Sequence, residues 1–202
     1  MRVKRIIHSK ALLFILPLIF GINSMFAQSK WSKSAQVDLV FPGKSEYFYK
    51  NSENVFYDED YEYDGFLLRS YGLQLDVNYF LFKKLSIGAL GGFQTQLKPN
   101  YSFLKLGGVL KYYFVNKDEV YVYLLDANNF SLNSDKFNKG NNFRLGLGVP
   151  FSQKKSYNMV LHLFFEQNFF RLEGSKPLLG VADEIPRSLT VKSFGVSFGV
   201  NF

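Results

Sequence analysis

The last ten residues of the chain show a pattern that recurs along most of its length. From Ser193 to Phe202, hydrophobic residues alternate with serine, glycine or asparagine. Alternation with a period of two places one kind of side chain on each face of a β-strand. The same pattern predicts seven further strands, over residues 37–41, 71–79, 85–94, 104–114, 120–127, 143–151 and 161–169. The sequence therefore predicts an all-β protein with eight strands.

The connections between these strands alternate in length. Short connections at 82–84, 116–119 and 152–156 alternate with long ones at 42–65, 126–142 and 174–188, and only 98–100 is short on the long side. An even number of strands, with both termini on the short-turn side, is typical of bacterial outer-membrane barrels. The predicted fold is an eight-stranded antiparallel up-and-down transmembrane β-barrel.

A soluble lipocalin-like ligand carrier also has eight alternating strands, but its apolar faces point inward. Glycine is frequent on the polar faces here, and small residues suit the crowded interior of a narrow membrane barrel. These glycines are Gly72, Gly88, Gly92, Gly107, Gly146, Gly148, Gly195 and Gly199. Aromatic residues at the short-turn ends of the strands predict an interfacial girdle. They are Tyr79, Phe80, Phe82, Tyr112, Tyr113, Phe114, Tyr121, Phe151, Tyr157 and Phe202.

Residues 1–27 predict a secretory signal peptide. Arg2, Lys4, Arg5 and Lys10 precede an apolar run over residues 11–22, which is too short to span a bilayer as a helix. Cleavage after Ala27 leaves residues 28–202 as the barrel domain, with 20 basic against 17 acidic residues in place of the net charge of +7. We therefore expect no nucleic-acid partner. The chain has no cysteine for a lipid anchor or a thiolate metal site, and no cofactor is expected.

The signal peptide, the alternating strands and the terminal sequence Ser-Phe-Gly-Val-Ser-Phe-Gly-Val-Asn-Phe resemble the small outer-membrane barrel families that include the OmpA transmembrane domain and OmpX. The resemblance covers the whole mature chain in architecture and the last strand in motif. It implies the outer membrane of a Gram-negative bacterium, with its lipid and lipopolysaccharide as surroundings. It also implies that the barrel assembly machinery reads Phe194, Phe198 and Phe202.

Charged residues at inward positions predict a polar network across the barrel. They are Asp38, Asp76, Lys105, Lys111, Arg144, His162 and Glu166. Buried charges require partners, so we expect these groups to pair and hold the barrel shut, with a narrow pore for small solutes as the alternative. A lipid A hydrolase is a further alternative, because lipid A deacylases are barrels with a histidine followed two places on by a serine. Phe164 occupies that place here, so the chain is predicted not to be an enzyme.

The first long connection, between Lys44 and Gly65, combines seven carboxylates with seven aromatic residues. In an extended segment, four of the carboxylates share one face and tyrosines occupy the other. The four are Asp58, Asp60, Glu62 and Asp64. Carboxylates are ligands for Ca²⁺ or Mg²⁺, exposed tyrosines are typical of surfaces that bind an extracellular protein, and a solvated loop is the third interpretation. The favoured function is a non-enzymatic barrel that stabilises the envelope or makes surface contacts through these loops.

Overall fold

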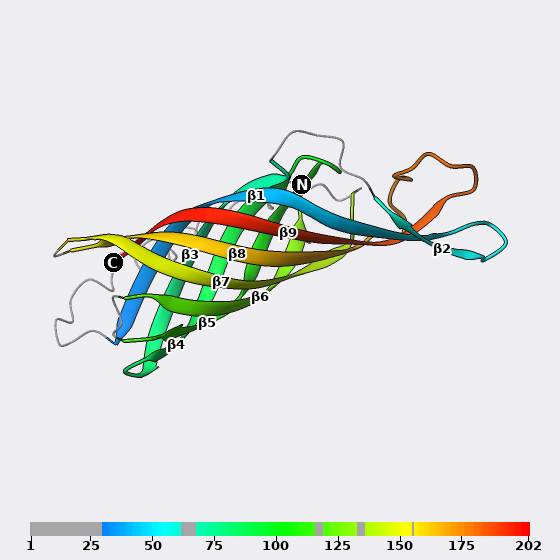
Figure 1. Ribbon diagram of the computed structural model, residues 1–202. Helices are drawn as coiled ribbons and strands as arrows, with labels where there is room; N and C mark the ends of the chain where they lie inside the picture. Colours follow the sequence, from blue (N-terminus) through cyan, green and yellow to red (C-terminus); the bar gives the residue numbers. More distant parts are fainter. Residues whose placement is uncertain (1–29, 62–67, 116–118, 133–135, 155) are drawn as a thin grey trace, which may run out of the picture. The chain divides into compact units, whose positions relative to one another are not determined.

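The computed structural model describes residues 30–61, 68–115, 119–132, 136–154 and 156–202, which form a closed antiparallel β-barrel (Figure 1). Its strands are β1 (Trp31–Lys50), β2 (Phe56–Asp60), β3 (Ser70–Phe82), β4 (Leu85–Gln96), β5 (Tyr101–Tyr113), β6 (Tyr121–Ser131), β7 (Lys139–Gln153), β8 (Asn158–Arg171) and β9 (Ile185–Asn201). β1 pairs with β3 and β9, which closes a wall of eight strands, and β2 is added to the distal part of β1. The predicted fold class is confirmed.

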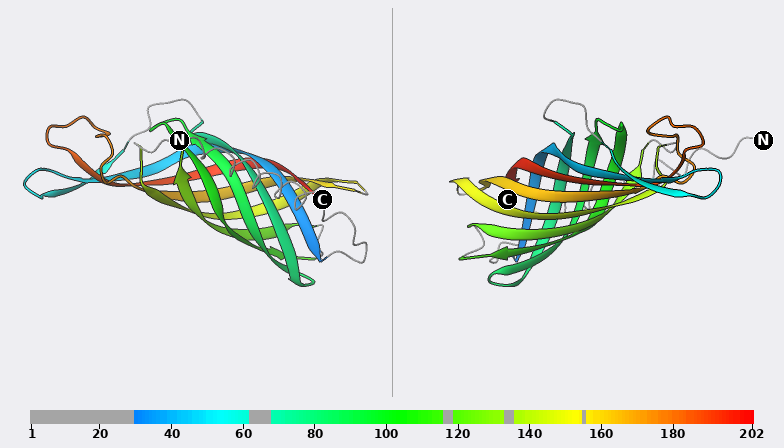
Figure 2. Two further views of the ribbon diagram at one scale, coloured as in Figure 1. Left: turned by 180° about the vertical axis from the view of Figure 1, so that it is seen from behind. Right: turned by 45° about the vertical axis from the view of Figure 1, so that its right-hand side comes forward.

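The predicted signal peptide, residues 1–27, lies outside the described residues. Within the described ranges, no helix is long and apolar enough to cross a membrane. The start of β1 pairs with the end of β9, Ser34 with Asn201, so both lie at one end of the barrel. We call this the terminus end and the opposite one, which carries β2, the hairpin end (Figure 2).

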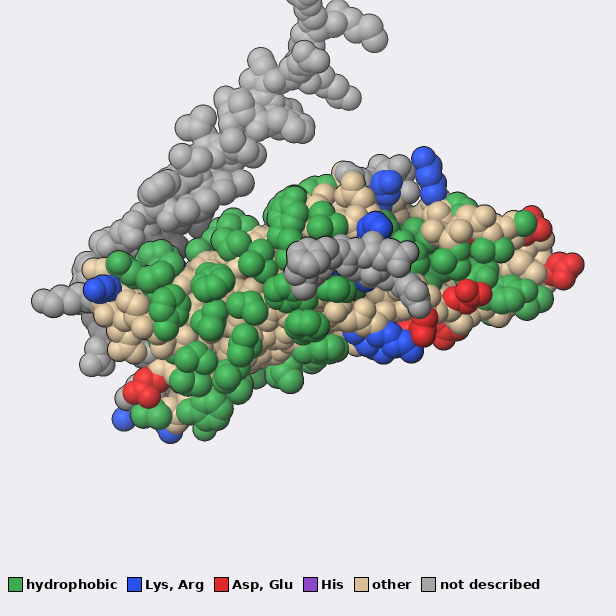
Figure 3. Space-filling model, turned by 45° about the horizontal axis from the view of Figure 1, so that its top comes forward, with side chains coloured by type: hydrophobic (Ala, Val, Ile, Leu, Met, Phe, Trp, Pro, Cys, Tyr) green, Lys and Arg blue, Asp and Glu red, His purple; other side chains and the backbone are tan. Residues whose placement is uncertain are grey.

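The outward-facing side chains of the wall are mostly apolar, whereas the charged and amide side chains of the strands point into the barrel. On β3, Leu73 and Leu75 are 51% and 53% exposed, whereas the intervening Gln74 and the following Asp76 are buried. Figure 3 shows hydrophobic side chains covering the barrel wall, with charged groups towards its ends. A continuous apolar surface around buried charged groups matches lipid rather than water. The lipocalin-like alternative, which requires the opposite arrangement, is therefore wrong.

The predicted aromatic girdle needs a correction at three positions. Tyr113 and Tyr121 are fully buried, and Phe80 packs against the same interior cluster. They stand at inward positions of their strands, where the end of the barrel is filled by rings. Outward-facing aromatic residues, Phe82, Tyr112, Phe114, Phe151, Tyr157 and Phe202 among them, surround the terminus end. The girdle is therefore formed by the outward positions alone.

The first long connection is largely strand, which corrects the predicted boundary at Pro42. β1 continues to Lys50 because β9 extends back to Ile185 and pairs with it over this whole length. The proline is accommodated by a shift in register between Pro42 and Ser45, where no ladder donor is needed. Gly43 lies at this bulge, and a Cβ atom there would come within 2.5 Å of the Lys192 carbonyl oxygen.

Glycines on the inner face make room for aromatic rings. Gly146 pairs with Tyr123 and Gly148 with Tyr121 across β7 and β6. A Cβ atom at Gly146 would lie 2.5 Å from the Tyr123 ring, and one at Gly148 would lie 2.4 Å from the Tyr121 ring. The glycine-rich inner face thus allows large rings from the neighbouring strand to fill a narrow lumen.

Candidate functional site

The seven charged residues predicted to face inward all lie inside the barrel, and all are buried. Near the terminus end, Lys111 on β5 forms an ion pair with Asp76 on β3, with 2.7 Å between Nζ and Oδ1. The side chains of Ser34 and Asn78 donate further hydrogen bonds to Asp76. This first cluster therefore balances one positive and one negative charge.

Glu166 on β8 is the hub of the second cluster. Its carboxylate accepts hydrogen bonds from two cations and three amides, supplied by β4, β5, β7 and β8 itself. The donors are Gln94 at 3.0 Å, Lys105 at 3.3 Å, Asn142 at 3.2 Å, Arg144 at 2.8 Å and Asn168 at 3.0 Å. One buried carboxylate thus links strands on different sides of the barrel.

Arg144 on β7 extends this cluster to β1. Its Nη2 atom lies 2.7 Å from Oδ2 of Asp38 and 2.8 Å from Oε2 of Glu166. The guanidinium carbon lies 3.8 Å from the centroid of the Phe164 ring, a cation–π contact. Two cations, Arg144 and Lys105, therefore face two carboxylates, which meets the requirement that buried charges be paired.

His162 does not join Glu166 in a catalytic pair. Its Nε2 atom lies 2.7 Å from the Tyr121 hydroxyl, and its ring packs edge-on against Tyr123. Glu166 is held by the donors described above, and Phe164, between the two residues, covers Arg144. The arrangement binds His162 into the interior packing and supplies no hydroxyl nucleophile at the Phe164 position.

A second apolar region, the aromatic plug, fills the barrel at the hairpin end. Its members are buried. They come from β1 and β9, which close the barrel, from β5 and β8, and from the connections before β7 and after β8. They are Tyr47, Tyr49, Tyr101, Phe103, Phe137, Phe170, Leu172, Leu189 and Val191. Phe137 and Phe170 have ring centroids 4.9 Å apart and contact both Tyr101 and Phe103. Side chains therefore fill the lumen on the hairpin side of the charged cluster.

The distal part of β1, β2 and the turn between them form a hairpin over residues 44–60, which we call the acidic hairpin. Asn51 closes its turn, because its side chain accepts hydrogen bonds from the amides of Glu53 and Val55. Asn54 follows with φ of 62°, a left-handed conformation that asparagine tolerates. β9 pairs with the β1 part of this hairpin up to Lys50, and the turn of the hairpin projects beyond the wall (Figures 1 and 2).

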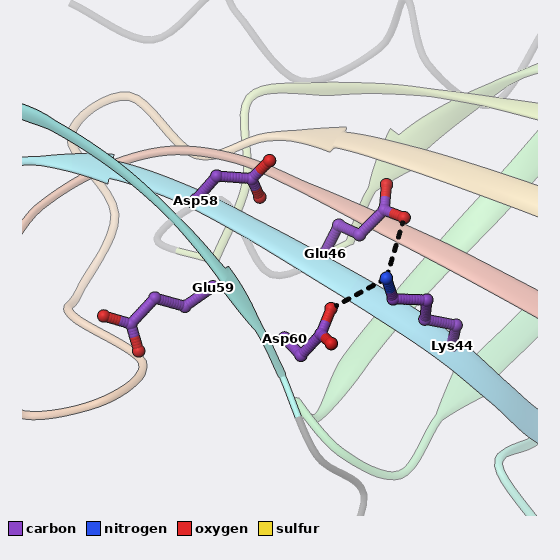
Figure 4. A pocket seen from close by; sticks show the side chains of 5 residues that line it. All are labelled: Lys44, Glu46, Asp58, Glu59 and Asp60. Atoms are coloured by element: carbon purple, nitrogen blue, oxygen red, sulfur yellow. Dashed lines mark ion pairs between the residues drawn. The ribbon is translucent and has the colours of Figure 1, made fainter.

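The carboxylates of the acidic hairpin surround a shallow hollow of about 500 Å³. In Figure 4 the ammonium of Lys44 lies between Glu46 and Asp60, whereas Asp58 and Glu59 stand apart from it. The distances from Lys44 Nζ are 3.7 Å to Glu46 and 3.1 Å to Asp60. The four carboxylates of the predicted cation site are divided, because Glu62 and Asp64 lie outside the described residues. In the described part no group of three or more His, Cys, Asp or Glu is placed to hold a metal ion, and this site stays a prediction.

Glu184, which the sequence analysis did not single out, organises the loop between β8 and β9. Its carboxylate accepts hydrogen bonds from the Tyr47 hydroxyl at 2.5 Å and from a series of backbone amides. These are the amides of Leu178 at 2.7 Å, Leu179 at 3.2 Å, Gly180 at 2.9 Å and Val181 at 3.2 Å. Burial by itself raises the pKa of Glu184, but these hydrogen bonds outweigh it and hold the pKa below the ordinary value of 4.5.

No sequence motif pointed to Glu184, since its partners are backbone groups that only the folded loop brings together. Gly180, with φ of 71°, and Asp183, with φ of 59°, turn the chain back onto the carboxylate. Leu178 then packs against the aromatic plug. The loop therefore covers the plug at the hairpin end. A pair of turn-forming residues shortly before a strand was the one available signal.

Of the three phenylalanines of the predicted assembly signal, Phe194 and Phe198 lie on the outer face of β9, and Phe202 directly follows the strand. Phe194, Phe198 and Phe202 are each more than half exposed. Phe198 lies opposite Val37 on β1 and Leu161 on β8, at the closure of the barrel. Their recognition by assembly machinery stays a prediction.

A scan against protein-family models finds no match, and a search of curated proteins finds none either. Solved structures with a similar fold include the outer membrane protein AlkL, with 11% identity and a TM-score of 0.49 over 89% of this chain and 92% of that one. Neisserial surface protein A has 14% identity and a TM-score of 0.46 over 86% and 96%. The outer membrane protein OprG of Pseudomonas aeruginosa has 12% identity and a TM-score of 0.41 over 85% and 95%. The specific resemblance to OmpA and OmpX stays a prediction.

Proposed function

We propose that this chain is a non-enzymatic protein of the outer membrane of a Gram-negative bacterium, with an occluded lumen and its acidic hairpin on the cell surface. The observation that supports the proposal is the filled interior. The ion-paired cluster around Glu166 and Arg144 lies inside the barrel, and the aromatic plug fills the lumen on its hairpin side. An eight-stranded barrel has room for side chains inside but not for a solute channel as well.

The orientation follows from the two ends of the barrel. Short turns and the chain termini lie on the periplasmic side in bacterial outer-membrane barrels, and the longer loops face outward. The acidic hairpin and the Glu184 loop are at the end opposite to the termini. They accordingly project from the cell, where they make surface contacts, while the exposed apolar wall lies in lipid.

Two measurements test this proposal, one on the refolded chain and one on membrane fractions from cells. In planar bilayers, we expect no stepwise conductance, because the interior charges are paired and the plug closes the hairpin end. In gels of separated membrane fractions, we expect the outer-membrane fraction to contain a form that shifts in mobility on boiling. Steady single-channel conductance would replace the proposal with a narrow pore, and an altered lipid A mass spectrum on deletion and restoration of the gene would replace it with a lipid A hydrolase.

A further inference from the structure

β2 is an edge strand of the acidic hairpin. It pairs with β1 on one side, and within the described ranges no strand pairs with its other side. All five of its residues are exposed. An unpaired edge presents a row of backbone N–H and C=O groups that can add a further strand. At this edge another chain can continue the sheet.

The register identifies which backbone groups point outward. The Tyr61 amide donates to the Ser45 carbonyl, and the Asn51 amide donates to the Val55 carbonyl, so the odd-numbered residues of this segment bond to β1. In an antiparallel ladder the backbone groups of successive residues point to opposite sides. The N–H and C=O groups of Phe56, Asp58 and Asp60 consequently face away from β1.

Charge decides what kind of strand fits this edge. The acidic hairpin carries five carboxylates against two lysines, and one of these, Lys44, is already paired with Glu46 and Asp60. Asp58 has no ion-pair partner in the described part of the chain and shares the outer face with Asp60. Antiparallel addition of a second copy through β2 would bring acidic residues against each other, which is destabilising. A basic strand is complementary.

An aromatic pair next to these carboxylates adds a contact for an apolar side chain. Phe48 and Phe56 stack with ring centroids 5.4 Å apart and an interplanar angle of 3°. Phe56 is 58% exposed, although it lies at the end of the barrel that carries the charged loops. Short length and charged side chains are enough to protect an edge strand against aggregation, and an exposed aromatic ring adds nothing to that protection. A stacked pair beside an open edge is suited to contact with a partner.

We propose that β2 binds a basic, extended segment of a partner protein by β-strand addition, with the partner's backbone on Phe56, Asp58 and Asp60. The partner is a protein outside the cell, which rests on the surface orientation in the proposed function. In antiparallel alignment, basic side chains two residues apart lie opposite Asp60 and Asp58, and an apolar one lies opposite Phe56. The recognised pattern is thus basic-x-basic-x-apolar.

The test uses the full-length chain refolded in detergent micelles and fluorescent peptides containing Lys-Thr-Lys-Val-Leu. Three versions are compared: unmodified, N-methylated on the two lysine amides, and N-methylated on the threonine and valine amides. The lysine amides face β2 and the other two face away, while charge and methyl count are equal in the two methylated versions. We expect lysine methylation to weaken binding by about tenfold or more, since hydrogen bonds are lost, and the other methylation to leave it nearly unchanged.

Two protein variants and an exchange measurement complete the test. Asp58→Lys is expected to abolish most of the binding, whereas Glu53→Lys, the same charge change in the turn, is expected to have a much smaller effect. Bound peptide should slow hydrogen exchange at the amides of residues 56, 58 and 60, and leave 57, 59 and 61 as they were. Salt at 1 M, where the screening length is about 3 Å, should weaken binding.

Several outcomes overturn the proposal. They are absence of binding at low salt, equal binding of the two methylated peptides, and protection of the same amides by concentration-dependent dimerisation of the chain. The conductance and gel measurements do not involve the acidic hairpin. Failure of strand addition is therefore distinguishable from failure of the proposed function.

Discussion

Two cations in this molecule each contact two carboxylates, in very different surroundings. Arg144 lies inside the barrel, fully buried, 2.7 Å from Asp38 and 2.8 Å from Glu166. Lys44 lies on the acidic hairpin, with its side chain 58% exposed, 3.7 Å from Glu46 and 3.1 Å from Asp60. Solvent screens the charges of the second group, whereas the first group is buried from bulk solvent. The interior charges therefore hold strands together, whereas the hairpin charges are available to a partner.

Removing each of the two cations is expected to give the largest difference in stability between the two regions. Arg144→Ala leaves two buried carboxylates with less than their full set of partners, and we expect the free energy of unfolding to fall by about 3–5 kcal/mol. Lys44→Ala removes an equivalent number of ion pairs from the surface and should leave stability unchanged. The measurement is urea unfolding of the barrel folded in lipid vesicles, followed by the gel shift between unboiled and boiled samples.

Arg171→Ala is the matched control for arginine itself, because Arg171 is an exposed residue at the end of β8. We expect wild-type stability for this variant. If Arg144→Ala unfolds at the same urea concentration as Arg171→Ala, the buried ion pairs do not hold the barrel and the contrast between the two regions fails.

The second test compares two apolar side chains that are exposed to a similar degree. The one on the barrel wall is expected to face lipid, and the one in the hairpin turn is expected to face water. Leu145 on the barrel wall is 51% exposed and Val55 in the hairpin turn is 47% exposed. Leu145→Lys places a charge in lipid near the middle of β7, at an expected cost of about 2–4 kcal/mol. Val55→Lys places it in water and should change stability by less than about 0.5 kcal/mol. Equal effects on unfolding in lipid vesicles would contradict the assignment of the wall to the bilayer.

Packing inside the wall is the third test. Gly146→Ala puts a methyl group where the Tyr123 ring lies, and overpacking of this kind costs about 1–3 kcal/mol. Gly108→Ala is the control, since its nearest neighbour would be 3.6 Å away. Unfolding midpoints in urea compare the two variants. If the Gly146→Ala barrel is as stable as the wild type, the interior has room for the added methyl group, and the lumen is less tightly filled than we propose.

The two regions also differ in how far the sequence predicts them. The wall alternates with a period of two, so strand faces and inward charges such as Arg144 and Glu166 follow from the sequence. The partners inside the barrel do not, because Glu166 bonds to residues on four strands whose relative stagger the sequence does not specify. Towards the hairpin, the alternation predicted a strand that ends at Phe41, but pairing with β9 carries β1 past Pro42 and Gly43 through a bulge.

The Glu184 loop shares properties with both regions, and changes in it are expected to have the smallest effect. Its carboxylate is buried as in the barrel interior, yet its donors belong to a surface loop and to Tyr47. Burial and the nearby Glu184 raise the pKa of Tyr47, so its hydroxyl stays a donor. Because the folded pKa of Glu184 is lowered, its stabilising effect is complete above the ordinary value of 4.5 and is lost as the pH falls through the folded value.

Acidification through the folded pKa of Glu184, which lies below 4.5, should therefore release the loop while the barrel stays folded. We expect the protection factors of the amides at residues 178–181 to fall by about tenfold, which corresponds to roughly 1.4 kcal/mol and to loss of hydrogen bonds to a charged acceptor. Glu184→Gln should produce the same loss at neutral pH, whereas Glu173→Gln, an exposed carboxylate of the same loop paired with Arg187, should not. If the Glu184→Gln loop stays protected, the aromatic plug and not the carboxylate fixes this loop, and the Glu184 loop belongs with the barrel interior in the comparison above.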